Sequence, residues 1–195
     1  MNLVAHQLLS FNNPEWQIGN HLGEVIKAKK YLHFPEPIQK GILLHRLIDS
    51  YTDAHEVVKK SSTLLHKDYG KYSPVIVDIF YDFILIKNWD KFNEVPFDIF
   101  KANCYKLFMQ YMDLYPPKLK MMTKALIKND WFAAYSNYDG IEKTLRGLSV
   151  RTTFQNNMYM AVKDLYIKES EFEANFMNFF PDLTHECKTF LGITS

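Results

Sequence analysis

Apolar residues recur every three or four positions along most of this 195-residue chain. Residues 76–89 and 97–112 show the spacing well, and such spacing is typical of helices that bury one face. Glycine-containing pairs that mark β-hairpins are nearly absent, with Asp139-Gly140 as the exception. The pattern therefore predicts an all-α protein, and no strand is expected.

Prolines and capping residues divide this pattern into ten predicted helices. Proline suits the first turn of a helix, so Pro14 and Pro74 mark helix starts, whereas Pro181 is expected to end a helix. Thr52 or Asp53 is expected to cap a helix that begins at the next residues. The predicted helices span residues 2–11, 14–28, 36–51, 54–68, 74–89, 96–114, 118–129, 138–149, 154–179 and 182–191. Because no repeat, low-complexity segment or linker interrupts them, residues 1–195 are expected to form a single compact multi-helix domain.

Composition and charge exclude several functional classes. At 47% hydrophobic residues the chain can bury a full core, and its net charge of +1 does not suit a nucleic-acid-binding protein. No apolar run approaches the roughly 20 residues of a membrane span, and the first residues lack the basic and apolar regions of a signal peptide. We therefore expect a cytoplasmic protein with no membrane partner. Its 15% aromatic content would supply either a core or a dimer interface, so an oligomer remains possible.

The two cysteines, Cys104 and Cys187, lie far apart in the sequence. Neither a zinc motif nor a disulfide framework can be built from that spacing. We expect both to be reduced, buried thiols.

The first candidate functional residues are His45, Asp49 and Asp53, which follow one another at intervals of four. Residues four apart lie on one face of a helix. One imidazole and two carboxylates on that face form a ligand set for a divalent metal. An alternative for Asp53 is that it serves only as a helix N-cap.

A second candidate group is Asp78 and Asp82, which are four apart in a strongly apolar predicted helix. Carboxylates are seldom buried unless they are paired or bound to a metal. A cation should therefore lie beside them, whether a metal, Arg46 or a lysine. The alternative is that both are buried ion-pair partners of Arg46 or Arg151.

The third candidate group is His6 and Glu24, close to the N-terminus. His6 lies in an otherwise apolar short helix, where a lone histidine is more often a hydrogen-bonded core residue than a ligand. Gly19 and Gly23 interrupt a helical pattern, at a cost of about 1 kcal/mol each relative to alanine, which indicates close helix packing or room for a ligand. Four other histidines have no comparable acidic neighbours and are interpreted as surface or packing residues: His21, His33, His66 and His185.

Six short segments, in order along the chain, carry a likeness to a known family. They cover residues 1–9, 19–24, 41–55, 77–85, 131–145 and 173–181, and the block from His45 to Asp53 is the most specific. Together they resemble the acyl carrier protein phosphodiesterase family. The resemblance implies an all-α fold related to the HD-type metal-dependent phosphohydrolases. It also implies hydrolysis of holo-acyl carrier protein to the apo form and 4′-phosphopantetheine.

The resemblance further implies a divalent metal, manganese or magnesium, and a set of site residues. Catalytic roles fall to His45, Asp49 and Arg46, and Arg46 would contact the phosphate together with Asn20 as a substrate-binding residue. The implied metal ligands are His45, Asp49 and Asp53, with Asp78, Asp82, Glu24 and His6 as further candidates. The chain departs from the family pattern at three positions, where it has Glu24, Leu47 and Phe83 in place of aspartate, arginine and histidine.

Acyl carrier proteins are acidic, so the docking surface for such a partner should be basic. Basic residues outnumber acidic ones in residues 27–71, and four lysines lie in residues 118–128. Ordinary solvated helix faces would explain each run equally well. Two alternatives to the family activity also remain: a metal-dependent phosphohydrolase acting on another small phosphoester, and a non-catalytic scaffold that binds acyl carrier protein.

Overall fold

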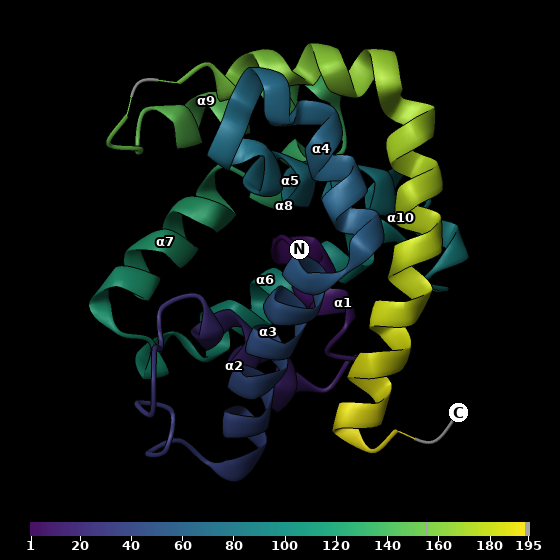
Figure 1. Ribbon diagram of the computed structural model, residues 1–195. Coiled ribbons are helices and arrows are strands. Elements are labelled where there is room, and N and C mark those ends of the chain that lie inside the picture. Colours follow the sequence, from purple (N-terminus) through teal and green to yellow (C-terminus); the bar gives the residue numbers. More distant parts are fainter. Residues whose placement is uncertain (155, 194–195) are drawn as a thin grey trace.

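The computed structural model describes residues 1–154 and 156–193, and within these residues it contains helices and no strand (Figure 1). The predicted all-α class is therefore confirmed. The ten α-helices are α1 (Leu3–Leu8), α2 (Pro14–Gly23), α3 (Glu36–Ala54), α4 (Glu56–Tyr69), α5 (Ser73–Lys87), α6 (Phe97–Gln110), α7 (Pro117–Lys128), α8 (Trp131–Ala134), α9 (Tyr138–Ser149) and α10 (Val162–Leu191). Four short 3-10 helices join them: η1 (Gly70–Tyr72), η2 (Trp89–Lys91), η3 (Met112–Leu114) and η4 (Met158–Ala161).

All ten α-helices contribute buried apolar side chains to one hydrophobic core. The long helix α10 runs down one side of the molecule (Figure 1) and packs a row of phenylalanines inward. Phe172 meets Phe80 of α5 edge-on at 5.1 Å between ring centroids, and Phe176 meets Tyr81 at 5.3 Å. Such edge-to-face pairs add to the free energy gained from burial, so α10 fixes α5 in place.

The starts of several helices follow the predicted capping chemistry. Helix α2 begins at Pro14, and the side chain of Asn13 accepts hydrogen bonds from the backbone N–H groups of Glu15 and Trp16, both at 3.1 Å. Helix α5 carries its proline in the first turn, as does α7. Proline is tolerated there because its missing N–H would have no partner inside the helix.

Two predicted boundaries in the last third of the chain are wrong. Helix α10 begins at Val162 rather than at residue 154, because residues 158–161 form the 3-10 helix η4 instead. It also continues through Pro181 to Leu191, with non-helical backbone angles only at Lys168. A proline removes one backbone hydrogen bond, but the adjacent turns are held by the buried side chains of Phe180 and Leu183. Tertiary packing therefore outweighs the helix-breaking tendency of the proline.

The predicted cap at Thr52 or Asp53 is also wrong. Helix α3 runs on to Ala54, and α4 is capped instead by His55, whose ring nitrogen Nδ1 accepts a hydrogen bond from the Val57 N–H at 3.3 Å. Asp53 therefore belongs to the last turn of α3, one turn beyond Asp49, and its N-cap role is excluded.

Helices α2 and α3 touch through glycine. A Cβ atom built on Gly19 would lie 2.2 Å from the carbonyl oxygen of Ile38, and one on Gly41 would lie 2.4 Å from that of Trp16. Neither glycine could be replaced without moving one backbone away from the other. The close helix packing predicted from Gly19 is therefore confirmed, and it brings α2 against the helix that carries His45.

Two further predictions concern thiols and membranes. In the described part of the chain Cys104 and Cys187 are both buried and unpaired, as expected, and burial raises the pKa of each thiol to about 12. None of the described helices combines the length and the apolar character needed to cross a membrane.

Candidate metal centre

Three predicted site residues converge where α1 meets α3. His6 comes from α1, and His45 and Asp49 come from successive turns of α3. The Nε2 atom of His6 lies 3.1 Å from Oδ1 of Asp49, and Nε2 of His45 lies 3.3 Å from Oδ2 of the same carboxylate. One potential ligand atom from each residue lies within 4.8 Å of the others. Two imidazoles and a carboxylate at this spacing can hold a metal ion.

Asn20 of α2 orients both imidazole rings. Its Oδ1 lies 2.8 Å from Nδ1 of His6 and 3.1 Å from Nδ1 of His45, while its Nδ2 donates to the His6 carbonyl and to the Ser10 hydroxyl. These two donations identify which atom of the amide is oxygen, and an amide oxygen only accepts hydrogen bonds. Both histidines must therefore carry a hydrogen on Nδ1, and in their neutral forms both Nε2 lone pairs face Asp49. Groups that hydrogen-bond the outer ring nitrogen of a metal-bound histidine fix its tautomer and orientation in this way.

The charge balance of this His6–His45–Asp49 cluster requires a cation. Two Nε2 lone pairs and a carboxylate repel one another unless a proton or a metal lies between them. Burial lowers the pKa of His6, but the hydrogen bond and charge of Asp49 outweigh it and raise the pKa above its ordinary value. Burial and the charge of His6 lower the pKa of His45. The protein thus favours one proton in the cluster, and a divalent metal would supply the same positive charge more completely.

The surroundings leave the cluster open on one side only. Both histidine side chains are buried, whereas the Asp49 side chain is 48% exposed. Gly23, at the end of α2, provides the space for the His45 ring, because a Cβ there would lie 2.4 Å from its Cγ atom. The room for a ligand predicted from this glycine is in fact filled by a side chain of the cluster.

The aspartates of α5 lie outside the cluster. Asp78 forms an ion pair with the amino group of Met1 at 3.0 Å, and this amino group is buried near the centre of the molecule (Figure 1). Asp82 is fully buried and accepts hydrogen bonds from the backbone N–H groups of Val4 and Ala5 at 2.8 and 3.3 Å. Burial raises the pKa of Asp82 to about 7. Asp82 therefore holds the start of α1, and with it the position of His6.

The alternative partners predicted for these aspartates, Arg46 and Arg151, are wrong. Asp78 pairs with the amino group of the chain and Asp82 with backbone N–H groups. The reason is topological, because α1 lies across α5 and delivers its first residues to both carboxylates.

Asp53 lies one turn beyond Asp49, on the exposed end of α3. Burial and the nearby charge of Asp78 raise its pKa. Asp53 is thus close enough to feel the other acids but is not among the three residues that converge.

The guanidinium of Arg46 is directed toward the segment after α2. It donates to the carbonyl oxygens of Ile26 and Ala28 at 3.2 and 2.7 Å, and it lies over the ring of Tyr31 at 5.0 Å. Arg46 therefore holds residues 26–31 against α3. Its phosphate contact stays a prediction.

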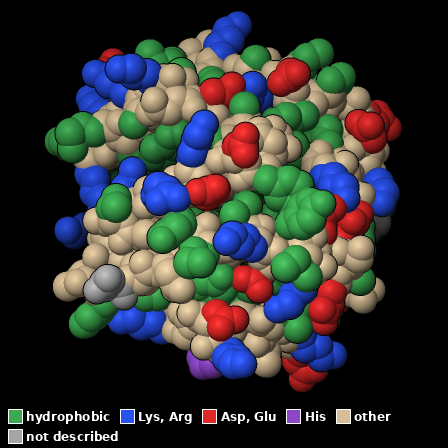
Figure 2. Space-filling view, turned by 90° about the horizontal axis from the view of Figure 1, so that it is seen from above, with side chains coloured by type: hydrophobic (Ala, Val, Ile, Leu, Met, Phe, Trp, Pro, Cys, Tyr) green, Lys and Arg blue, Asp and Glu red, His purple; other side chains and the backbone are tan. Residues whose placement is uncertain are grey.

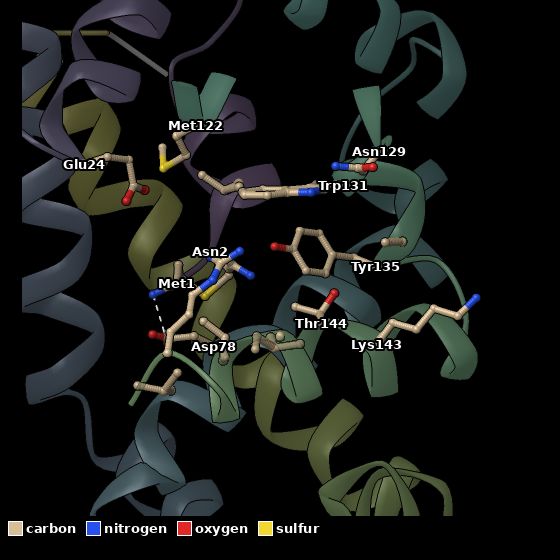
Figure 3. A pocket seen from close by; sticks show the side chains of 17 residues that line it. Met1, Asn2, Glu24, Asp78, Met122, Asn129, Trp131, Tyr135, Lys143 and Thr144 are labelled. Carbon is tan, nitrogen blue, oxygen red and sulfur yellow. Dashed lines mark ion pairs between the residues drawn. The ribbon is translucent and has the colours of Figure 1, made fainter. Parts of the chain in front are cut away.

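A cavity of about 460 Å³ (Figure 3) is lined by Glu24, which directly follows Gly23, the residue packed against the His45 ring, so the cavity approaches the cluster at this point. Glu24 and Asp78 line it on one side, and Trp131 and Tyr135 line it on the other. Burial is the largest influence on the pKa of both His6 and His45 and acts to lower it, whereas the negative charge of Glu24 acts in the opposite direction on each. The cavity and the cluster therefore share one electrostatic environment.

Residue-by-residue reasoning missed most of this cavity. One wall comes from α8, from Tyr135 directly after it and from α9, and it includes Trp131 and Gly147. Only the family likeness of residues 131–145 pointed to that region. No acid or histidine marks it, so a search for catalytic side chains passes over it.

The structure also places the residues that depart from the family pattern. Glu24 faces the cavity, Phe83 is buried against Tyr138 of α9 at 5.1 Å between rings, and Leu47 packs on the core. Of the three, Glu24 alone lines the cavity.

His21 is a packing residue, as predicted. Its Nε2 lies 2.8 Å from the hydroxyl of Thr123 in α7, its ring stacks on Phe108 at 4.1 Å, and burial lowers its pKa to about 3. It stays neutral and ties α2 to α7.

Comparison with known proteins connects this geometry to a family. The sequence model of acyl carrier protein phosphodiesterase matches residues 1–183. A protein of that name from Enterobacter sp. (strain 638) is 23% identical over 189 residues, covering 96% of this chain and 98% of the relative. Relatives of the same name from Photorhabdus laumondii and Yersinia pestis are 25% and 24% identical, and they cover 93% and 96% of this chain and 92% and 98% of their own lengths. No solved structure matches this chain.

Proposed function

We propose that this chain, which belongs to the acyl carrier protein phosphodiesterase family, hydrolyses the phosphodiester that joins 4′-phosphopantetheine to the serine of holo-acyl carrier protein. The products are apo-acyl carrier protein and free 4′-phosphopantetheine. One observation carries the proposal: His6, His45 and Asp49 converge within 4.8 Å, beside a cavity of about 460 Å³. A charged cluster for phosphoryl chemistry and a space for a long substrate arm are what this reaction requires.

We further propose that the cluster holds a divalent metal through His6, His45 and Asp49. The two imidazole donors suit manganese better than magnesium, because magnesium prefers oxygen ligands. When bound, such a metal lowers the pKa of a coordinated water and offsets charge on phosphoryl oxygens. The sequence analysis gave four further acids as candidate metal ligands: Asp53, Asp78, Asp82 and Glu24. We propose that these four carboxylates lie around the metal centre without binding the ion.

The residues of the chain have separable tasks in this proposal. Asn20 fixes the tautomer and the orientation of both imidazoles, since its Oδ1 bonds both Nδ1 atoms. Asp49 joins the two rings on the solvent side of the cluster. Glu24 lines the cavity (Figure 3), and its carboxylate would accept a proton from an attacking water.

The partner in this proposal is an acidic acyl carrier protein, and α7 is the surface we propose for it. Lys118, Lys124 and Lys128 of α7 are exposed, and the helix contains no acidic residue. The face over α4, α9 and the start of α10 instead carries basic and acidic side chains interspersed (Figure 2). Because Met122 of α7 lines the cavity, a carrier protein docked there would lie next to the cavity that its arm must enter.

The test combines metal analysis with a mass measurement. The purified protein is analysed for bound metal and then incubated with holo-acyl carrier protein and manganese, and the carrier is weighed by mass spectrometry. Loss of the arm is the expected result. Bound metal without loss of the arm would favour a phosphohydrolase of another small phosphoester, and neither metal nor loss would favour a non-catalytic scaffold.

A further inference from the structure

We infer that the cavity beside the cluster is the binding site for the pantetheine arm of the substrate. The inference takes the identity of the ligand from the proposed function, but its location and chemistry come from the cavity itself. At about 460 Å³ the cavity lies within the usual size range of small-molecule sites, roughly 300–1,000 Å³.

The walls of the cavity match a chain that alternates apolar and amide groups. Val75, Ile79 and Leu148 give it apolar surface, while Asn129 and Thr144 offer amide and hydroxyl groups. The pantetheine arm carries a dimethyl-substituted carbon, two amides and a terminal thiol, so it needs both kinds of contact. A fatty acyl chain would offer no hydrogen-bond partner to the Thr144 hydroxyl or to the amide oxygen of Asn129, and polar contacts with the wall would be lost.

The two ends of the cavity are lined by different residues. Glu24, Met1 and Asp78 lie at one end, while Asn129 and Lys143 lie at the other, with Trp131 and Tyr135 between them (Figure 3). The first end adjoins the cluster, because Glu24 directly follows Gly23, where an added Cβ atom would lie 2.4 Å from Cγ of His45. The phosphoryl end of the arm would therefore lie at the Glu24 end and the thiol would extend past Trp131 toward Asn129.

One glycine allows this site to be blocked without disturbing the fold. Gly147 lies in α9, lines the cavity and has ordinary helical backbone angles. A Cβ atom added there meets no other atom within 4 Å. A larger side chain at this position would occupy the cavity, whereas alanine would leave most of it free.

The experiment measures binding of pantetheine, without its phosphate, to the metal-free protein by isothermal titration calorimetry. We expect Gly147→Ala to retain affinity within about twofold and Gly147→Leu to lose about tenfold or more, since the leucine removes apolar contact area. Glu171→Leu adds the same side chain to an exposed position of α10 outside the cavity, and it should bind as the unmodified protein does. Thr144→Leu fills the same cavity from the preceding turn and replaces Gly147→Leu if that variant fails to fold.

Three results would overturn the inference: no binding of pantetheine to the unmodified protein, unchanged binding in both leucine variants of α9, or displacement of pantetheine by a nucleotide. The measurement is independent of turnover. If the arm is not released from holo-acyl carrier protein but pantetheine binds and is blocked, the proposed function fails and the site stands. If the arm is released at an unchanged rate by Gly147→Leu, the site fails and the proposed function stands.

Discussion

The His6–His45–Asp49 cluster and the cavity beside it are built in opposite ways. In the cluster, hydrogen bonds fix the side chains: Oδ1 of Asn20 accepts a hydrogen bond from Nδ1 of each imidazole ring. Gly23 leaves the space that the His45 ring occupies. The cavity is lined largely by residues of α5, α8 and α9, among them the apolar Val75, Ile79 and Leu148. Charged groups need fixed hydrogen-bond partners to stay in position, whereas a long flexible ligand needs a cavity of sufficient volume with both apolar and polar walls.

The largest expected effect comes from removing the carboxylate of the cluster. Asp49→Ala should lower metal affinity and kcat by more than about 100-fold, because even second-shell changes at metal sites cost 10–100-fold. The side chain is about half exposed, so the fold should survive. Metal content, turnover of holo-acyl carrier protein and far-ultraviolet circular dichroism check these points.

Asp90→Ala is the matched control for Asp49→Ala, since Asp90 is exposed in η2 and lies outside both the cluster and the cavity. It should leave metal content and turnover unchanged. Unchanged metal content in Asp49→Ala itself would remove Asp49 from the proposed site.

A smaller effect is expected at the residue that orients the rings. Asn20→Ala should weaken metal binding by about 10–100-fold, because both imidazoles lose the acceptor that sets their tautomer. Asn20→Asp keeps an oxygen at this position and loses the donations to the His6 carbonyl and to Ser10. We expect its metal affinity to exceed that of Asn20→Ala, as measured by competition with a chelator, and equal affinities would argue against the orienting role.

Replacement of glycine by alanine should change stability in opposite directions at Gly23, which packs on the cluster, and at Gly147, which lines the cavity. Gly23→Ala should destabilise the protein by about 1–3 kcal/mol, because the new methyl group overlaps the His45 ring. Gly147→Ala should stabilise it by about 0.5–1 kcal/mol, because alanine suits a helix better than glycine and meets no neighbour there. Urea unfolding curves measure both, and a loss of stability in the two variants alike would contradict the contrast.

An effect that is absent near pH 7 and grows as the pH falls concerns the contact between α2, which carries Asn20, and α7, which carries Met122 of the cavity wall. Burial lowers the pKa of His21 from 6.5 to about 3. Between these two pH values the unfolded chain binds a proton at His21 that the folded protein does not, so stability falls as the pH falls through this window. The contribution is at most about 1.4 kcal/mol per pH unit.

His21→Gln removes this titration while keeping a side chain that can hydrogen-bond Thr123. The difference in unfolding free energy between this variant and the unmodified protein, measured from pH 7 to pH 4, should grow in favour of the variant as the pH falls. A difference that stays constant with pH would show that His21 is protonated in the folded protein.

Local pattern predicted the helices well where local chemistry decides them. The prolines at the starts of α2 and α5 were interpreted correctly because a proline in a first helical turn loses nothing. The end predicted at Pro181 failed because buried phenylalanines hold α10 together across it. In the same way Asp53, which looked like a cap, lies inside α3 because that helix continues to Ala54.

From the amino-acid sequence alone it follows that His45 and Asp49 face the same way, because four residues make slightly more than one helical turn. The family also follows from it, through segments spread along nearly the whole chain. The packing of the helices, in contrast, brings His6 and Asn20 to the cluster and leaves Asp78 and Asp82 to bind the N-terminus and α1. Helical periodicity fixes directions within one helix, whereas contacts between helices depend on how their surfaces pack.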